Sequence, residues 1–330
     1  MAQDHDHGHD PAHHRGAVAG APAHQHVQGH THGHTHVDFA EMLPLLVREA
    51  ELFSPAYTEA ASWLREQRPE PGMVVDAGSG PGVVSCLLAE TFPGARVVAV
   101  DGAEPLLAEA RSRAERLGVA DRFSTVEAEL QDGIGDVEYP ADLIWASRSL
   151  HHVGDQRAAL AGFVRGLAPG GTLALLEGGL PTRFLPRDIG IGRPGLQARV
   201  DAVHEEWFTR MREDLPGAVS ETEDWPALLT AVGLRHAATR TFLVDLPAPL
   251  SDEARAFVVA SLARRRDGLA RRRDGLAEGL TPEDVTTLDR LLDPDDKASV
   301  HHRTDTFVLT ALTVHVGVKP EQRSAGPAPE

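Results

Sequence analysis

The chain has 330 residues, and its 32 basic and 49 acidic residues give a net charge of −17 at neutral pH. This charge opposes polyanionic partners, so we expect neither nucleic acid nor an anionic membrane surface to bind. Cys86 is the only cysteine, which excludes an intramolecular disulfide and a thiolate zinc cage. Because there is no secretion signal and no apolar run of membrane-spanning length, the sequence predicts a cytoplasmic protein.

Both ends of the chain have compositions that do not favour a packed core. Residues 1–36 carry 11 of the 18 histidines and almost no large apolar side chain, so they cannot offset the entropy lost on ordering. We expect residues 1–36 and 319–330 to be disordered tails. The histidines could bind a divalent metal through neutral imidazoles, and a solvated tail without metal is the alternative. The candidate metal ligands are His30, His32, His34 and His36.

Amphipathic helices and buried strands follow in chain order from residue 37. Apolar residues at helical spacing predict cover helices within residues 37–70. Over residues 71–180, short apolar strands such as "ARVVAVD" and "ADLIWAS" alternate with longer helical segments. This alternation indicates an α/β fold with a parallel sheet that helices cover on both faces.

The second half of the chain departs from this regular alternation. Residues 181–248 combine loops, a helix at "LQARVDAVHEEWFTRMRE", and a core helix and strand at "WPALLTAVGL" and "RHAATRTFLVDL". Residues 249–303 form a helical insert, and residues 304–318 form a last core strand. The insert contains "RRRDGLA" twice, at 264–270 and 271–277. Seven residues are close to two helical turns, so we expect the duplication to lengthen a solvated helix.

The stretch "VVDAGSGPGVVS", residues 74–85, places an acid and three glycines after a buried strand. A dinucleotide-binding loop would have a small residue at the position of Val83, and Asp76 would repel a pyrophosphate. Both features disfavour a nicotinamide-dependent oxidoreductase. An acid at this place suits a ligand with cationic groups and no phosphate, such as S-adenosylmethionine. The residues expected to bind that cofactor here are Asp76, Gly78, Gly80 and Gly82.

Five motifs in order resemble those of class I S-adenosylmethionine-dependent methyltransferases. The glycine loop is similar to the family's first motif, "VVAVDGAEPLLAEAR" to its second strand, and "VEAELQDG" to its third-strand exit. "ADLIWASRSLHHVGD" resembles the fourth strand, and "LAPGGTLALLEGG" the turn and fifth strand. The resemblance covers residues 74–179. It implies a Rossmann-like methyltransferase fold with a mostly parallel seven-stranded sheet, helices on both faces and helical insertions.

The resemblance also implies roles for residues at the ends of these strands. Asp101 takes the place that binds both ribose hydroxyls, because a carboxylate can accept two hydrogen bonds. Gly102 and Leu106 fall where the family borders the adenine. Glu129 falls where an acid meets the adenine amino group, although an aspartate is usual there. Further residues expected at the cofactor are Ala128, Leu130 and Ser147.

Candidate catalytic residues follow the fourth and fifth strands, where open α/β sheets bind their ligands. His151 and His152 have side chains that can remove a proton near neutral pH, and packing is their alternative role. Glu177 is an alternative acid or base. On the acceptor side, Arg148 could steer an acidic acceptor or remain solvated, and we expect Tyr57 of the cover helices to close over the cofactor.

These features predict methyl transfer from S-adenosylmethionine to O, N or C of a small-molecule acceptor. The segment "ASRSLHH" contains no Asn-Pro-Pro-Tyr sequence, which disfavours methylation of exocyclic amino groups of nucleobases. The inserts at 181–224 and 249–303 would then form a lid or an acceptor pocket. The alternatives are a non-catalytic cofactor-binding protein, a metal-handling protein that uses the histidine tail, and an NAD-dependent oxidoreductase.

Overall fold

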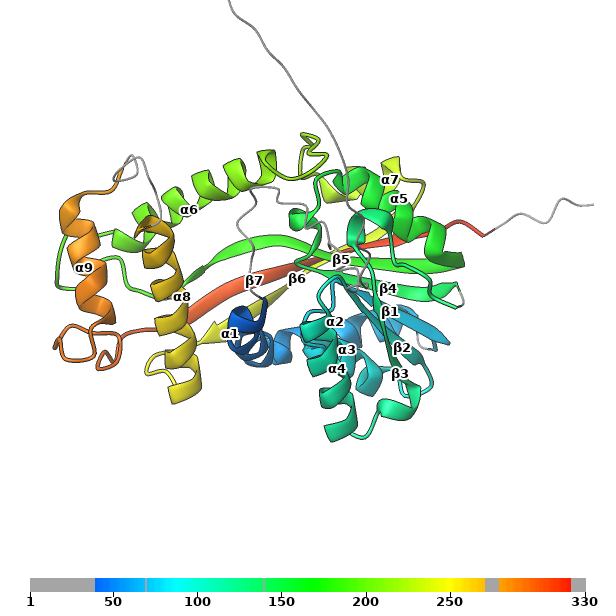
Figure 1. Ribbon diagram of the computed structural model, residues 1–330, viewed down its shortest axis with the longest axis horizontal. Coiled ribbons are helices and arrows are strands. Elements are labelled where there is room, and N and C mark those ends of the chain that lie inside the picture. Colours follow the sequence, from blue (N-terminus) through cyan, green and yellow to red (C-terminus); the bar gives the residue numbers. More distant parts are fainter. Residues whose placement is uncertain (1–38, 69, 139, 271–278, 322–330) are drawn as a thin grey trace, which may run out of the picture. The chain divides into compact units, whose positions relative to one another are not determined.

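The computed structural model describes residues 39–68, 70–138, 140–270 and 279–321. Within them, a seven-stranded sheet has the order β3-β2-β1-β4-β5-β7-β6 (Figure 1). The strands are β1 (Met73–Ala77), β2 (Arg96–Asp101), β3 (Phe123–Glu127), β4 (Ala141–Ser147), β5 (Leu167–Arg183), β6 (Arg235–Leu246) and β7 (Val308–Val318). Strand β7 is antiparallel to both β5 and β6, and the other neighbours pair in parallel. The mostly parallel seven-stranded sheet is confirmed, as a mixed sheet with one reversed strand.

Helices cover both faces of this sheet, as the alternation of elements predicts. Helices α2, α3 and α4 lie on one face, and α5 and α7 lie on the other (Figure 1). The described helices are α1 (Phe39–Leu52), α2 (Ser54–Gln67), α3 (Val83–Thr91), α4 (Glu104–Arg116), α5 (Gln156–Gly166), α6 (Leu196–Glu213), α7 (Trp225–Ala231), α8 (Asp252–Ala270) and α9 (Pro282–Leu292). Helix α6 and strand β6 begin and end at the residues that the sequence patterns predict.

Two hydrophobic cores result, one on each face of the sheet. Successive side chains of a strand point to opposite faces. Val74 and Trp145 therefore belong to the core beneath α2 and α3, while Val75 and Ile144 belong to the core beneath α5 and α7. All five residues of β1 are buried, which is typical of a central parallel strand. Because β1 packs against a core on each face, the position where the following loop begins is well defined.

The inserts pack around the extended ends of the last three strands. Strands β5, β6 and β7 run on past the end of β4, and α6, α8 and α9 gather around their far ends (Figure 1). The first "RRRDGLA" copy lies in α8, while the second, at 271–277, lies outside the described residues. The first copy was expected to be solvated, and for Arg265 this is wrong, because only 17 % of its side chain is exposed.

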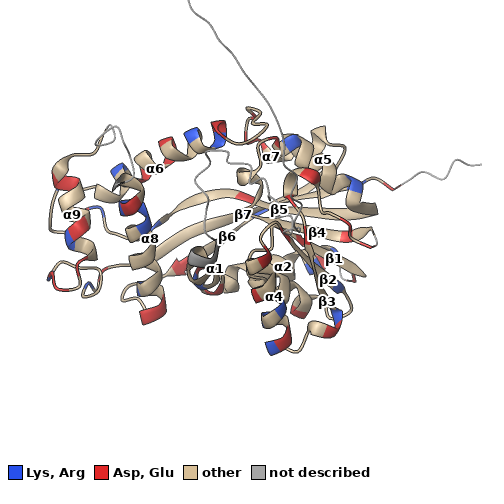
Figure 2. Ribbon diagram, viewed as in Figure 1, with Lys and Arg blue, Asp and Glu red and all other residues tan. Residues whose placement is uncertain are grey.

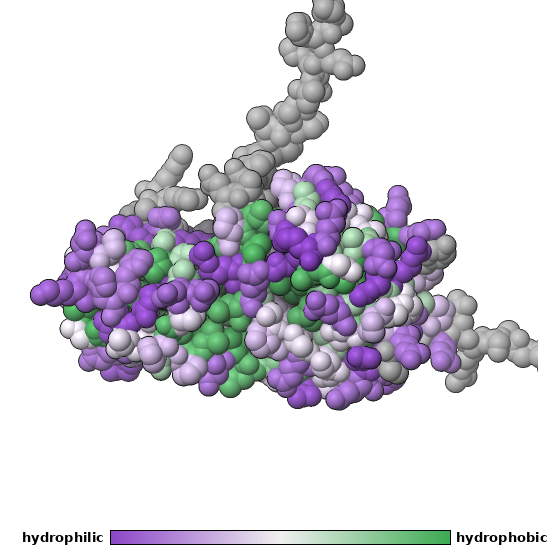
Figure 3. Space-filling model, turned by 90° about the horizontal axis from the view of Figure 1, so that it is seen from below, coloured by the Kyte–Doolittle hydropathy of each residue, from purple (hydrophilic) through white to green (hydrophobic). Residues whose placement is uncertain are grey.

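Charged residues of both signs lie on the helices, most visibly along α6 and α4 (Figure 2). The view from below shows a broad apolar area bordered by polar residues (Figure 3). Exposed apolar side chains include Leu243 of β6 and Leu309 of β7. Among the described residues, no helix is both long enough and apolar enough to cross a membrane. The predicted histidine tail and C-terminal tail, except for residues 319–321, lie outside the described residues.

Candidate active site

The glycine loop after β1 depends on backbone conformations that favour glycine. Gly78, Gly80 and Gly82 have φ angles of 76°, 53° and 74°, in the left-handed region. A Cβ on Gly78 would lie 2.4 Å from the Cβ of Ser149, and one on Gly82 would lie 2.4 Å from the Cβ of Ala110. A Cβ on Gly80 would meet no atom within 4 Å. Two glycines therefore permit close packing beneath the loop, and Gly80 faces open space.

Asp76 lies beneath this loop rather than on its open side. Its side chain is buried, and one carboxylate oxygen accepts a hydrogen bond of 2.5 Å from Oγ of Ser85 in α3. Burial raises the pKa of Asp76 to about 7, and the nearby Asp101 carboxylate also raises it, against the opposing effect of Ser85. The observed partner of Asp76 is a helix residue, so its predicted contact with the cofactor stays a prediction.

The ends of β1, β2 and β3 meet at the open side of the loop. Oδ2 of Asp101 accepts a hydrogen bond from the backbone N–H of Gly80 at 2.9 Å, and Oδ1 accepts one from Ala103 at 3.0 Å. A Cβ on Gly102 would lie 2.8 Å from Oε1 of Glu129, which is exposed. Burial raises the pKa of Asp101. Residues far apart in sequence are thus brought to one edge, as the resemblance implies.

The other residues expected at the cofactor lie around this edge, and their side chains differ in how far they are buried. Leu106 is buried in α4, whereas Ala128 and Leu130 are half-buried and pack against the core beneath α5. Ser147, at the end of β4, is half-buried within hydrogen-bonding reach of Tyr57. Tyr57 itself is buried in α2. Its hydroxyl group therefore contacts the turn that follows β4.

Glu177 fixes that turn from strand β5. Its Oε1 accepts hydrogen bonds from the backbone N–H groups of Ser149 and Leu150, both at 2.8 Å, and only 4 % of Glu177 is exposed. Its Oε2 lies 3.1 Å from Nδ1 of His151. Oγ of Ser149 donates to the carbonyl oxygen of Ala77, which ties the turn to the glycine loop. The geometry of Glu177 is that of a residue that positions the turn and the His151 ring.

The two candidate histidines lie in a short 3-10 turn, Leu150–His152, next to α6. The rings of His151 and His152 are 4.1 Å apart between centroids, and the His151 ring lies 5.6 Å from that of Phe208 in α6. Arg212 of α6 also donates hydrogen bonds to the carbonyl oxygens of His151 and Val153. His151 is half-buried and His152 is exposed. Packing and turn formation account for the contacts that both histidines make.

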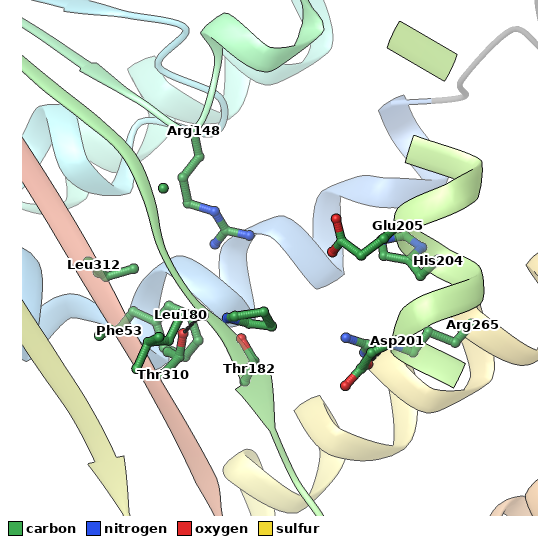
Figure 4. Close-up of a pocket in the computed structure, with 13 residues that line it drawn as sticks. Phe53, Arg148, Leu180, Thr182, Asp201, His204, Glu205, Arg265, Thr310 and Leu312 are labelled. Atoms are coloured by element: carbon green, nitrogen blue, oxygen red, sulfur yellow. Dashed lines mark hydrogen bonds and ion pairs between the residues drawn. The ribbon is translucent and has the colours of Figure 1, made fainter. Parts of the chain in front are cut away.

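A cavity of about 210 Å³ lies beyond this turn, between the extended strands and the inserts (Figure 4). It is lined by the turn between α1 and α2, by strands β5 and β7, and by helices α6 and α8. Among the lining residues are Phe53, Arg148, Thr182, Asp201, His204, Glu205, Arg265 and Thr310. Both inserts that were expected to form a lid or pocket contribute to it. The cavity shares Arg148 with the turn that packs on the glycine loop.

Arg148 projects its guanidinium into the cavity (Figure 4) from a strained backbone. Its φ of 52° is the only positive φ at a non-glycine position among the described residues. The guanidinium forms an ion pair with Glu49 of α1, and 43 % of the Arg148 side chain remains exposed. Glu49 and the Tyr57 hydroxyl raise the pKa of Arg148, against the opposing effect of burial. Arg148 is therefore cationic at every physiological pH.

The opposite wall of the cavity comes from α6 and α8. Nε of Arg265 lies 3.4 Å from Oδ1 of Asp201, and its guanidinium lies over the Phe184 ring at 5.1 Å. His204 stacks on Trp207. Burial and two arginines of α8 lower the pKa of His204 to about 4, so its ring is neutral at pH 7.

These residues of α6 and α8 were not among the site residues predicted from the sequence. Asp201 and His204 are three residues apart and therefore share one face of α6 with the buried Val200 and Val203. A titratable pair on an apolar helix face is the signal that could have identified them. Among the described residues, no group of three His, Cys, Asp or Glu side chains could hold a metal ion. The predicted ligands His30, His32, His34 and His36 lie outside the described residues.

Comparisons with known proteins locate a recognisable domain at the glycine loop. Residues 74–171 match a family model described as a methyltransferase domain. The chain is 29 % identical over 199 residues to trans-aconitate 2-methyltransferase of Streptomyces coelicolor, covering 58 % of this chain and 60 % of that protein. It is 34 % identical over 113 residues to tRNA 5-carboxymethoxyuridine methyltransferase of Escherichia coli, covering 34 % and 42 %.

Among solved structures, an S-adenosylhomocysteine complex of a methyltransferase from Geobacter sulfurreducens aligns with a TM-score of 0.43 and 16 % identity. That alignment covers 79 % of this chain and 90 % of the other. The chain spans 60 % or less of the length of the two curated relatives described above.

Proposed function

We propose that this chain transfers a methyl group from S-adenosylmethionine to a small-molecule acceptor, because residues 74–171 match a methyltransferase-domain model and the motifs of residues 74–179 resemble those of the class I S-adenosylmethionine-dependent methyltransferases. The observation that carries the proposal is the shared turn after β4. Ser149 packs against Gly78 of the cofactor loop, while its neighbour Arg148 lines the cavity. One turn thus connects a cofactor edge with a space for the acceptor.

The residues at the cofactor edge fit S-adenosylmethionine. Gly80 leaves open space above the loop, and the Asp101 carboxylate lies at this open side, whereas Asp76 is buried beneath the loop. The Asp101 carboxylate at this edge disfavours a pyrophosphate and suits a ligand that carries an ammonium and a sulfonium group. Each oxygen of Asp101 accepts one backbone hydrogen bond and retains a second lone pair for a ribose hydroxyl. When bound, S-adenosylmethionine supplies an electrophilic methyl group.

The size of the cavity supports a small acceptor. At about 210 Å³, it is smaller than the roughly 300–1,000 Å³ of pockets that hold drug-sized ligands. One curated relative is named for trans-aconitate and another for a tRNA nucleoside. The net charge of −17 opposes binding of a whole tRNA, so the charge favours the small molecule. What the chain must supply is alignment of the acceptor with the methyl group.

Among the candidate bases, His151 has more support than Glu177. Both Glu177 oxygens already face N–H groups or the His151 ring, so the carboxylate is committed to positioning. We propose His151 as the base for acceptors that must lose a proton, with His152 as the alternative. For such an acceptor, His151→Ala should lower turnover about 10²- to 10⁴-fold. For an acceptor that is already ionised, the same variant should retain turnover within a few-fold.

Binding calorimetry followed by a product assay tests the proposed function. S-adenosylmethionine, NADH and Zn²⁺ are titrated separately into the full chain and into a chain lacking residues 1–36. We expect S-adenosylmethionine to bind both proteins equally and NADH to bind neither. Formation of S-adenosylhomocysteine is then measured with a panel of small acids, phenols and amines, and with unmodified tRNA. Cofactor binding without turnover on any acceptor would favour the non-catalytic alternative, and turnover on tRNA alone would contradict the small-molecule acceptor.

A further inference from the structure

Arg148 occupies a place where both its backbone and its charge need an explanation. A positive φ is costly for a residue with a Cβ, and such strain persists only where the surrounding structure enforces it. Here the backbone N–H of Arg148 donates to the carbonyl oxygen of Leu176 in β5, which anchors the strained residue. The result is that the guanidinium points into the cavity rather than along the strand (Figure 4).

The Arg148 guanidinium already forms an ion pair with a carboxylate of the same chain. Glu49 forms an ion pair with Arg148, and its helix, α1, is only loosely buried. Among the residues of α1 whose burial the structure describes, 42–52, none is fully buried. Glu49 thus comes from a helix with no fully buried residue in this range, although only 19 % of its own side chain is exposed, whereas the backbone of Arg148 is anchored to β5. An arginine that donates to one carboxylate can donate to another, and its guanidinium has further N–H groups for a second hydrogen bond.

The rest of the cavity is mixed in charge and rich in hydrogen-bonding groups. On the far wall, Asp201 already pairs with Arg265, while Glu205 also lines the space. Thr182 and His204 add neutral polar groups. Of the two arginines that line the cavity, Arg148 is the one in the turn that packs on the cofactor loop, and its partner Glu49 belongs to α1. Because Arg265 is paired with Asp201, Arg148 is the arginine of the cavity that an acid can bind by displacing Glu49.

We propose that the acceptor is an organic acid whose carboxylate binds Arg148 in place of Glu49. This inference rests on the proposed function and names the class of substrate for the same site. Glu49 then has two effects. It neutralises Arg148 while the cavity is without acceptor, and it competes with the incoming acid. Removing the Glu49 charge should strengthen acid binding, whereas a purely structural ion pair predicts no gain.

The experiment measures acid binding by calorimetry with S-adenosylhomocysteine present at saturation. The probes are trans-aconitate and its neutral trimethyl ester, titrated into wild type, Arg148→Gln and Glu49→Gln. We expect wild type to bind the acid and not the ester. Arg148→Gln should weaken acid binding at least tenfold, and Glu49→Gln should strengthen it several-fold. Glu59→Gln removes a surface ion pair with Arg240 and serves as the matched control, for which affinity should equal that of wild type.

The outcomes separate this inference from the proposed function. S-adenosylhomocysteine titrated alone reports the cofactor site, and its failure to bind wild type would defeat the proposed function itself. If it binds but the acid and the ester bind equally, the organic-acid acceptor is overturned. Weaker acid binding in Glu49→Gln would overturn the competition, because Glu49 would then support the site. Since Glu49→Gln keeps the shape of the side chain, this arm stands even if Arg148→Gln fails to fold.

Discussion

Oε2 of Glu177 lies 3.1 Å from Nδ1 of His151, while Oε1 of the same carboxylate accepts two backbone hydrogen bonds from the turn that carries that histidine. One buried side chain thus fixes both the backbone and the ring. Glu177 of β5 thereby sets the geometry of the turn that follows β4. This turn lies between the glycine loop and the cavity. These contacts make Glu177 a positioning residue, and the stability of Glu177 variants tests this role.

Replacing Glu177 should separate its structural role from any chemical one. Glu177→Ala leaves two buried N–H groups without their acceptor, which costs about 1–3 kcal/mol each. Glu177→Gln keeps an acceptor oxygen at the same place and should cost less than about 1.5 kcal/mol. Urea denaturation of both variants measures the difference. Equal destabilisation by the two substitutions would show that the backbone hydrogen bonds are not what Glu177 contributes.

Asp101 should govern cofactor affinity through hydrogen bonds that a neutral side chain cannot make. Asp101→Ala should weaken S-adenosylmethionine binding by about 1.5–3 kcal/mol, the range for a hydrogen bond to a charged group. Asp121→Ala is the matched control, because Asp121 is an exposed aspartate in the turn before β3, at the other end of the strands. Calorimetry measures both affinities. Unchanged affinity in Asp101→Ala would remove this residue from the cofactor site.

Gly80 and Gly82 should respond differently to the same substitution. Gly82→Ala would bring a Cβ to 2.7 Å from the Cα of Ala110, so α3 or α4 must shift in addition to the strain of a positive φ. We expect a loss of roughly 2–5 kcal/mol in stability. Gly80→Ala meets no neighbour and should cost only about 1–2 kcal/mol, while weakening cofactor binding. Thermal unfolding and calorimetry measure the two effects, and a reversed order of stability would refute the packing argument.

The edge where these residues meet was predictable because parallel strands bring their carboxyl ends together. That rule places Gly80, Asp101 and Glu129 side by side without any knowledge of packing. The orientation of Asp76 was not predictable in the same way. Every residue of β1 is buried, so the alternation of the strand does not indicate which face opens toward a ligand. The sequence of β1 is therefore the same whether the Asp76 side chain points toward the cofactor or toward α3.

The cavity depends on contacts between segments that are distant in sequence. Arg265 and Asp201 meet only because α8 packs beside α6 after long connections, and neither helix carries a motif. The pattern "RRRDGLA" therefore indicated a solvated helix, although one arginine of the first copy faces the cavity. The strained φ of Arg148 was equally hidden, because arginine is not a residue that favours turns.

The pH dependence of stability should report the burial of Asp76. Its pKa in the folded protein is about 7, above the value of about 3.9 for an unfolded chain. Between these pH values the folded state holds a proton that the unfolded state has released, so stability falls as pH rises from about 4 to 7. Asp76→Asn removes this effect. The stability of wild type relative to the variant should decline by on the order of 4 kcal/mol across this window.

Chemical denaturation of wild type and Asp76→Asn at several pH values measures this decline. Other titrating groups are common to both proteins and cancel in the difference. Ser85→Ala provides a second check, since loss of the hydrogen bond that lowers the pKa of Asp76 should move the window to higher pH. A difference that stays constant from pH 4 to pH 7 would mean that Asp76 is ionised throughout.

The strain at Arg148 should be measurable by comparing glycine with alanine at that position. Both substitutions remove the guanidinium and its ion pair with Glu49, but only glycine relieves the positive φ. Arg148→Gly should therefore be more stable than Arg148→Ala by about 1 kcal/mol. Arg111, which is exposed within α4, is the control, because there glycine should be less stable than alanine by roughly 0.5–1 kcal/mol.

The sign of the glycine-minus-alanine difference thus distinguishes the two sites, and urea denaturation measures it in all four variants. If the two Arg148 variants lose acid binding equally while differing in stability, the strained conformation costs stability and the guanidinium provides recognition. If alanine is as stable as glycine at position 148, the backbone there carries no strain. The turn after β4 would then hold its shape through its hydrogen bonds with Glu177, Ala77 and Arg212, and the direction of the Arg148 side chain would need another cause.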